Sequence, residues 1–284
     1  MKYQIYNCNT DAGERVNGTS LGPKVISKSL VLKDVINIDN SISFKKSEIK
    51  YNNIKNLKEI NYVNELLYNK IIENKDKFNI VLGGDHSISI ASILASNKIN
   101  NNLGVMWIDA HTDFNTITST RTGNVHGLPL ISTIKNNNDV LSSFHNGEYI
   151  NNENIVVVGA RSIDEWERPN LKNNNILVFT TNDIKLKGID NIMNEAFNYL
   201  MSKTNNIHIS FDLDLIDPKL APGVSVPEVN GINLSEVNGI IDSINKHSNV
   251  IRSLDLVEYN PLLDKDNKTL DIAVNIIKSL INFD

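Results

Sequence analysis

Short apolar runs rich in valine and isoleucine alternate along the chain with longer segments in which apolar residues recur at helical spacing. Several of these runs are continuously apolar, which is typical of strands buried on both faces of a parallel sheet. The pattern predicts eight strands, at residues 3–7, 35–38, 80–83, 104–109, 155–159, 176–180, 207–212 and 252–258.

Between these strands, apolar side chains gather on one face of each helical segment. Two such faces are formed by Val63, Leu66, Leu67 and Ile71 and by Leu234, Val237, Ile241 and Ile244, and a last helix is expected over 270–281. Repeated strand–helix alternation predicts an α/β fold, with three αβα layers and a parallel sheet of about eight strands. The chain has no internal repeat and no Pro/Gly-rich linker, so we expect one domain over residues 1–284.

Composition and net charge limit the kinds of molecule that we expect this protein to bind. The chain is 40% hydrophobic and 21% charged, as expected for a protein with a sizeable core. A net charge of -5 provides no general attraction for nucleic acid or an anionic membrane, and we expect neither as a partner. No apolar run approaches the roughly 20 residues that span a bilayer, and the N-terminus lacks the apolar stretch of a signal peptide. We therefore expect a cytoplasmic protein.

The chain has a single cysteine, Cys8, so an intramolecular disulfide is excluded. A reducing compartment is the simpler interpretation. Cys8 lies in an apolar opening segment, and we expect it to be a small core residue rather than a nucleophile.

Histidine and aspartate residues come directly after three of the predicted strands, where open parallel sheets place their ligand sites. Asp109, His111 and Asp113 follow one strand at a spacing of two, which directs their side chains to the same side of an extended chain. Burying several unpaired carboxylates would cost several kcal/mol for each charge, on the order of magnitude known for buried ions. One such segment alone equally fits a turn or a helix cap, but three together favour a cation.

The potential metal ligands are two imidazoles and four carboxylates, a donor set that suits Mn²⁺ and disfavours a thiolate site of the zinc-finger type. Six donors exceed what one catalytic ion needs, so we expect two ions, roughly 3.5–4 Å apart as in other two-metal hydrolytic sites. The six residues are His86, Asp109, His111, Asp113, Asp212 and Asp214.

Three segments resemble, in order, the metal-binding signatures of the arginase/agmatinase (ureohydrolase) family. They are Gly83-Gly84-Asp85-His86-Ser87, Asp109-Ala110-His111-Thr112-Asp113 and Ser210-Phe211-Asp212-Leu213-Asp214. The resemblance spans the chain from about residue 81 to the C-terminus, with a weaker opening strand. It implies two Mn²⁺ per subunit, with His86 and Asp113 on one ion, His111 and Asp214 on the other, and Asp109 and Asp212 bridging them.

The resemblance also implies a reaction, in which a metal-bridging hydroxide attacks the guanidinium carbon of L-arginine to give L-ornithine and urea. Besides the metal-binding Asp113, the expected catalytic residues are His126, as proton shuttle, and Glu258, which would pair with the guanidinium group. The family pattern assigns Asn115, Thr122 and Asn124 to the substrate carboxylate, and Asp164, supported by Glu167, to its α-amino group. The spacing of Asp164 and Glu167 by itself equally fits a solvated helix start.

Three positions depart from the arginase pattern. Val226 replaces a threonine whose hydroxyl lies near the guanidinium group and its glutamate. Ser162 stands where many arginases have aspartate, and Thr122 stands for the usual serine. The amino-acid sequence of residues 221–227 resembles that of formiminoglutamases. The alternative to an arginase is therefore a formiminoglutamase, an agmatinase or another guanidino-acid hydrolase of this family.

Two readings outside the ureohydrolases are a binding protein with a decayed metal site and a deacetylase-like amidohydrolase with a single zinc. Intact residues at all six ligand positions disfavour the first, and the ligand pattern disfavours the second. The relatives form trimers or hexamers, which implies a homo-oligomer.

Overall fold

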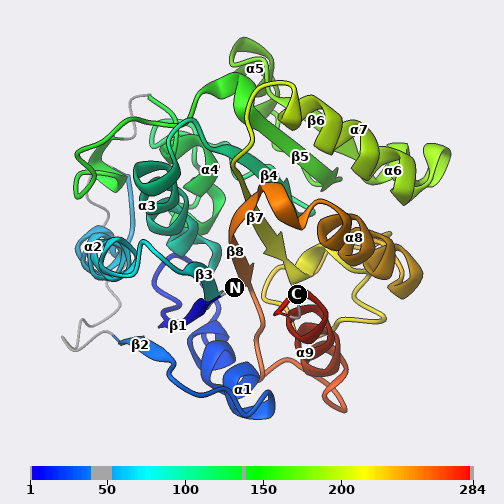
Figure 1. Ribbon diagram of the computed structural model, residues 1–284, viewed down its shortest axis with the longest axis horizontal. Helices are drawn as coiled ribbons and strands as arrows, with labels where there is room; N and C mark the ends of the chain where they lie inside the picture. The colour runs from blue at the N-terminus through cyan, green and yellow to red at the C-terminus, as the bar shows by residue number, and fades with distance from the viewer. Residues whose placement is uncertain (1, 40–52, 136–138, 282–284) are drawn as a thin grey trace.

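The computed structural model describes residues 2–39, 53–135 and 139–281 (Figure 1). Eight strands form one sheet: β1 (Tyr3–Asn9), β2 (Ile36–Asp39), β3 (Phe78–Gly83), β4 (Gly104–Ile108), β5 (Ile155–Ala160), β6 (Leu177–Thr180), β7 (Ile207–Asp212) and β8 (Ile251–Val257). The strand order is β2-β1-β3-β8-β7-β4-β5-β6, and every neighbouring pair is parallel. The eight-stranded parallel sheet predicted from the sequence is therefore confirmed.

Helices cover both faces of the sheet, as Figure 1 shows with α2 to α4 on one side and α7 to α9 on the other. In the described residues the α-helices are α1 (Gly22–Ser29), α2 (Leu57–Glu73), α3 (Ser89–Asn100), α4 (Pro129–Ser132), α5 (Glu167–Asn173), α6 (Thr181–Lys187), α7 (Ile189–Met201), α8 (Leu234–Lys246) and α9 (Lys268–Ile281). None of these helices is both long enough and apolar enough to cross a bilayer.

Alternate strand residues point to opposite faces and so supply two layers of core. Ile80 and Leu82 of β3 belong to the core cluster that also contains side chains of α1 and α6 to α9, whereas Val81 between them belongs to the cluster that contains side chains of α2 and α3. Trp107 of β4 belongs to a third cluster, with α3, α4 and α5. Because helices cover both faces of the sheet, the central strands are largely apolar along their length. These continuous apolar runs are the feature of the sequence that predicted buried parallel strands.

The predicted strands agree with the observed ones to within two residues at each end. Asp109 and Glu258, placed by the sequence at the ends of strands, instead lie just beyond β4 and β8. Cys8 is fully buried in β1, as expected. Leu234 was expected on the buried face of α8 but is 43% exposed, because it is the first residue of the helix and lies outside the stretch that packs on the core.

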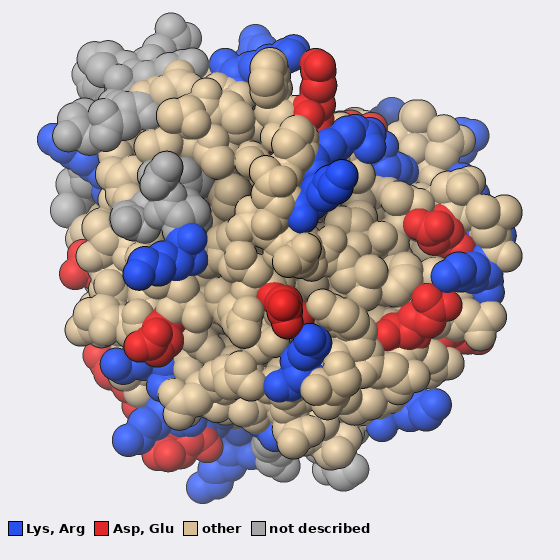
Figure 2. Space-filling view, turned by 90° about the horizontal axis from the view of Figure 1, so that it is seen from above, with Lys and Arg blue, Asp and Glu red and all other residues tan. Residues whose placement is uncertain are grey.

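Charged side chains of both signs are interspersed over the face seen in Figure 2, without a broad patch of one sign. The molecule's concentrated charge lies instead in its interior, at the carboxyl ends of the four central strands β3, β8, β7 and β4.

Candidate metal centre and substrate pocket

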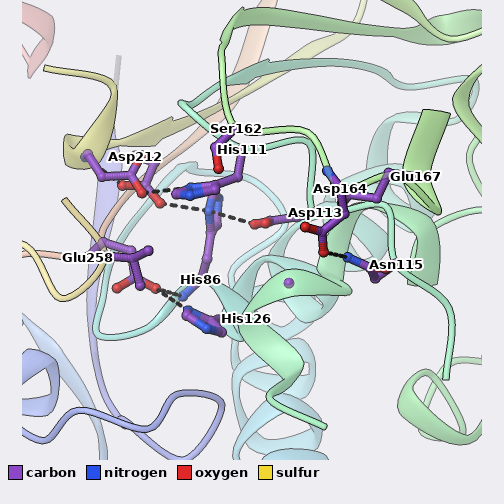
Figure 3. Close-up of a pocket in the computed structure, with 13 residues that line it drawn as sticks. His86, His111, Asp113, Asn115, His126, Ser162, Asp164, Glu167, Asp212 and Glu258 are labelled. Carbon is purple, nitrogen blue, oxygen red and sulfur yellow. Dashed lines mark hydrogen bonds and ion pairs between the residues drawn. The ribbon is translucent and has the colours of Figure 1, made fainter. Parts of the chain in front are cut away.

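A pocket with a cavity volume of about 120 Å³ opens at this end of the sheet, and its walls are built mainly by the segments that follow the central strands (Figure 3). The segment after β3 provides His86, and the segment after β4 provides His111 and Asp113. Asp212 and Asp214 come from β7 and the turn after it. The sequence placed these residues together, and the structure brings them into one cavity.

His86 forms the first of two adjoining centres. Its Nδ1 lies 3.1 Å from Asp109 Oδ2, 3.0 Å from Asp212 Oδ2 and 3.3 Å from Asp113 Oδ2. Figure 3 shows this imidazole between Asp113 and Asp212. Ligand-type atoms of His86, Asp109 and Asp212 therefore lie within 4.8 Å of one another, as those of one ion site would, and Asp113 lies beside His86.

His111 forms the second centre. Its Nδ1 lies 2.9 Å from Asp214 Oδ2 and 3.5 Å from Asp109 Oδ1. Asp109 belongs to both groups of potential ligands, with one oxygen toward each histidine. A shared carboxylate between two such groups is the arrangement expected when two ions lie side by side.

Buried partners hold these groups in place. Trp107 donates a 2.9 Å hydrogen bond from Nε1 to Asp109, and its ring stacks on that of His86 at a centroid distance of 3.9 Å. His86 Nε2 lies 2.9 Å from Ser210 Oγ, so the other ring nitrogen, Nδ1, is left to face the carboxylates. Fixing the far nitrogen of a histidine in this way selects the tautomer and orientation that suit a metal ligand.

The electrostatics of the cluster fit a pair of cations. Burial and the neighbouring carboxylates raise the pKa of Asp212 and Asp113 well above the usual range. Burial alone would raise the pKa of Asp109 too, but hydrogen bonding and the charges of His111 and His86 lower it. Nδ1 of His86 is buried, and among the described residues none makes a well-aligned hydrogen bond to it, although three carboxylates lie within 3.3 Å. Bound cations would be coordinated by this nitrogen and would relieve the repulsion between the carboxylates.

Two of the residues in this pocket have strained backbones. Asp113 has φ 46° and Glu258 has φ 68°, both in the left-handed region that residues other than glycine rarely adopt. Such a conformation costs on the order of 1–3 kcal/mol and persists where the surrounding structure enforces it. Here it turns both carboxylates into the pocket directly after β4 and β8.

His126 and Glu258 lie at one end of the pocket, with His126 Nδ1 3.6 Å from Glu258 Oε1. The carboxylate of Glu258 also accepts a 2.8 Å hydrogen bond from the His86 main-chain nitrogen, which fixes its position. Burial and the nearby Asp85 raise the pKa of Glu258 to about 8. Burial lowers the pKa of His126, which favours the neutral imidazole and leaves it able to take up a proton.

The opposite end of the pocket is polar. Asn115 Nδ2 donates to Asp164 Oδ2 at 2.9 Å, and Asp164 is solvent-exposed. Glu167 is buried and accepts hydrogen bonds of 2.8 Å from the main-chain nitrogens of Phe114 and Asp164, so it joins the two loops that carry this end.

The remaining residues expected near the substrate are placed differently. Val226 lines the pocket, as do Asn115, Asp164 and Glu167. Thr122 and Asn124 lie in the loop leading to His126 but do not line the pocket. Asn124 accepts a hydrogen bond from Lys55 at 3.2 Å, and Thr122 accepts one from the Asn124 main chain at 3.1 Å.

Three residues of this region were missed by the sequence reasoning. Glu14 lies in the loop after β1 and forms a compact group with Glu258, which is buried like Glu14 itself, and with the partly exposed His126. Glu228 and Arg161 lie beside His111 and Asp214. The one feature of the sequence that could have indicated Glu14 and Arg161 is that both follow strands of the sheet, as the other site residues do.

Two adjoining His/carboxylate centres at the carboxyl edge of a parallel α/β sheet define the class of a two-metal hydrolase. The model of the "Arginase family" matches residues 1–282, well beyond the region of resemblance seen in the motifs. The arginase of Bacillus subtilis (strain 168) is 36% identical over 282 residues, which cover 95% of this chain and 94% of that protein.

Solved structures of arginases are also similar to this chain. The arginase of Bacillus caldovelox superimposes with a TM-score of 0.93 at 31% identity, covering 99% of each chain. The Entamoeba histolytica arginase in complex with L-ornithine has a TM-score of 0.89 at 30% identity, covering 99% of this chain and 100% of that one. This chain belongs to the arginase family, and it is a hydrolase that acts on guanidino or amidine C–N bonds.

Proposed function

We propose that this protein hydrolyses L-arginine to L-ornithine and urea, with two Mn²⁺ ions bound in the pocket. The observation that carries the proposal is the division of one pocket into two ends. A pair of His/carboxylate centres with Glu258 and His126 occupies one end, and the Asn115–Asp164 pair occupies the other. A substrate with a guanidinium group and an amino-acid head fits this division.

For the metal ions we assign one to His86 and Asp113 and the other to His111 and Asp214. Asp109, which belongs to both groups of potential ligands, would serve both ions, and Asp212 would be the second shared ligand. The oxygen-rich donor set supports Mn²⁺. Bound ions of this kind lower the pKa of a water molecule, so that it can attack the substrate at neutral pH.

Glu258 is the residue that we assign to the guanidinium group. Its carboxylate is buried and held by the His86 main chain, so its direction is fixed before substrate binds. A cationic guanidinium beside it would favour its ionised form, because an opposite charge lowers the pKa of a carboxyl group. Charge-assisted hydrogen bonds between these groups would orient the guanidinium carbon toward the metal centres.

His126 is assigned to proton transfer. As the carbon–oxygen bond forms on the guanidinium carbon, the carbon–nitrogen bond to the ornithine side chain breaks, and that nitrogen needs a proton to leave as an amine. The His126 imidazole lies in the pocket beside Glu258, and its lowered pKa keeps it neutral until it takes up the proton released by the attacking water. It then gives this proton to the departing amine.

The amino-acid head is assigned to the mouth of the pocket. The exposed carboxylate of Asp164 would pair with the α-ammonium group, and Glu167 would hold the Asp164 loop in place. Asn115 would donate to the α-carboxylate. Thr122 and Asn124, which do not line the pocket, would contact this carboxylate only where it extends beyond the pocket mouth. The name of the Entamoeba relative, an arginase in complex with L-ornithine, supports a product of this shape.

The test is to load the purified protein with Mn²⁺ and measure urea release from L-arginine, agmatine and guanidinobutyrate. Formamide and ammonia release from formiminoglutamate should be measured in parallel. We expect urea from L-arginine far above the other substrates, and loss of this preference in Asp164→Ala with metal content unchanged. A protein that prefers another substrate would keep the metal site but contradict the arginine assignment, and would point to Val226.

Cytoplasmic location and a homo-oligomeric state, a trimer or a hexamer, are also part of this proposal. Light scattering of the metal-loaded protein measures the oligomeric state directly.

A further inference from the structure

Glu228 lies in the loop after β7, beside His111, and has no part in the function proposed above. Its Oε1 is 3.5 Å from Nε2 of His111. It also forms a side-chain hydrogen bond with Ser162, whose strand-like bridge with His111 brings the three residues together. One carboxylate therefore contacts the far side of an imidazole that belongs to the second metal centre.

The main chain at Glu228 is held by the half-buried guanidinium of Arg161. Arg161 donates hydrogen bonds to the main-chain oxygens of Asp214 at 2.8 Å and Leu215 at 3.0 Å. The same group donates to the main-chain oxygens of Glu228 at 2.9 Å and Val229 at 3.1 Å. Because one side chain joins the two loops, the main chain at Glu228 is held close to the main chain at Asp214.

The two histidines of the pocket differ in what faces their Nε2 atoms. His86 meets a hydroxyl, Ser210 Oγ, at 2.9 Å, whereas His111 meets the carboxylate of Glu228. Both rings turn Nδ1 toward the ion position, so in both the proton must lie on Nε2. A carboxylate that accepts this proton's hydrogen bond makes the imidazole a stronger ligand than a hydroxyl does.

We propose that Glu228 is a positioning residue, which accepts the hydrogen bond from Nε2–H of His111 and so directs Nδ1 to the ion between Asp109 and Asp214. This inference rests on the two-metal site of the proposed function. Its consequence is that the two ions are not equivalent, because only the ion on His111 depends on Glu228.

The experiment is a calorimetric titration of the metal-stripped full chain with Mn²⁺. In Glu228→Val we expect one of the two ions to bind about 10–100-fold more weakly, as happens when such partners are removed. The affinity of the other ion should be unchanged and serves as an internal control for folding. Glu228→Gln keeps an acceptor for the imidazole N–H, so its loss of Mn²⁺ affinity should be smaller than that of the valine variant.

Glu165→Gln is the matched control, because Glu165 is an exposed carboxylate in the nearby 161–167 segment. It should bind both ions as the wild type does. The inference is overturned if Glu228→Val binds both ions normally, or if both weaken equally together with a lower Tm. It is also overturned if only the KM for arginine rises, since Glu228 would then contact the substrate head.

Failure of the proposed reaction gives a different result. A wild-type protein that binds two ions but releases no urea contradicts the arginine assignment, while the titration still decides the role of Glu228. A wild-type protein that binds fewer than two ions overturns the inference itself.

Discussion

The carboxyl group of Glu14 lies in the protein interior, near those of Glu258 and Asp85. The side chain is 4% exposed, and Thr19 donates a hydrogen bond to its Oε1. In the part of the chain that the structure describes, no group forms a hydrogen bond with its buried Oε2. Burial, reinforced by the charges of Glu258 and Asp85, raises the pKa of Glu14 from 4.5 to about 9. Glu14 is therefore protonated in the folded protein at neutral pH but ionised in the unfolded chain.

This difference makes stability depend on pH. A raised folded pKa means that the contribution of Glu14 is complete below about pH 4.5 and is lost as the pH rises toward 9. For one group the slope reaches at most about 1.4 kcal/mol per pH unit. We expect Glu14→Gln to lose less stability than the wild type between pH 5 and pH 9, measured by urea unfolding of EDTA-treated protein. Glu165→Gln should behave as the wild type, and equal slopes for all three proteins would contradict the prediction.

Val226 permits a second test at the residue scale, because threonine has nearly the same shape as valine and adds one hydroxyl. Val226 lines the pocket. If the hydroxyl reaches the guanidinium or Glu258, one hydrogen bond worth about 0.5–1.5 kcal/mol is gained. Val226→Thr should then raise kcat/KM for L-arginine by about 2–10-fold, measured by urea release. An unchanged or lower value would show that this wall of the pocket does not face the reacting group.

At the scale of elements, the site depends on how closely the loops after the strands approach one another. Gly84 is the clearest case, since a Cβ built there would lie 1.8 Å from the main-chain oxygen of Thr10. Gly84 also donates to Cys8 O at 3.0 Å and accepts from Glu258 N at 2.8 Å. The segments after β1, β3 and β8 therefore meet at one glycine.

Gly84→Ala should separate these segments, because the contact is with main chain that has no freedom to rotate away. We expect a loss of more than about 3 kcal/mol in the free energy of unfolding, beyond the usual range for single substitutions. Gly127→Ala is the control for stability, because a Cβ there meets nothing within 4 Å. Urea unfolding of the two variants side by side provides the comparison, and equal losses would argue against the close approach.

The elements also show what could be predicted from the sequence. The eight strands could be predicted because burial on both faces leaves a continuous apolar run, as in residues 155–158. The six candidate metal ligands follow such runs directly. Glu228 could not be found this way, because its contact with His111 crosses more than a hundred residues and depends on the hydrogen bonds of Arg161. Nor does the spacing of Glu14 indicate that the loop after β1 turns into the pocket.

At the scale of the whole molecule, the parallel sheet directs the carboxyl ends of β3, β8, β7 and β4 to one edge, and so concentrates acidic side chains in its interior. Burial, together with repulsion between the carboxylates, raises the pKa of Asp113 and Asp212, and both effects oppose folding of the ionised cluster when no cation is bound. Metal binding should thus stabilise the entire fold, not only the pocket.

We expect Mn²⁺ to raise the free energy of unfolding by about 2.7 kcal/mol for each site when the free ion is at 100 times its Kd. A chain of this size should show a rise in Tm of several degrees, roughly 2–4 °C for each kcal/mol. Differential scanning calorimetry with Mn²⁺, and with EDTA as the control, measures the shift. Identical Tm values in the two conditions would mean that the carboxylate cluster is not a cation site.

Cys8 provides a way to follow how the sheet opens over time. It is the chain's only cysteine and is fully buried in β1, where it lies opposite Ile38 of β2 and Gly83 of β3. Burial raises the pKa of its thiol, so the reactive thiolate is scarce as well as inaccessible. A thiol-reactive dye will therefore attach only during the intervals when β1 separates from its neighbours. Each chain takes up one dye, so the rate of labelling measures the rate of that opening.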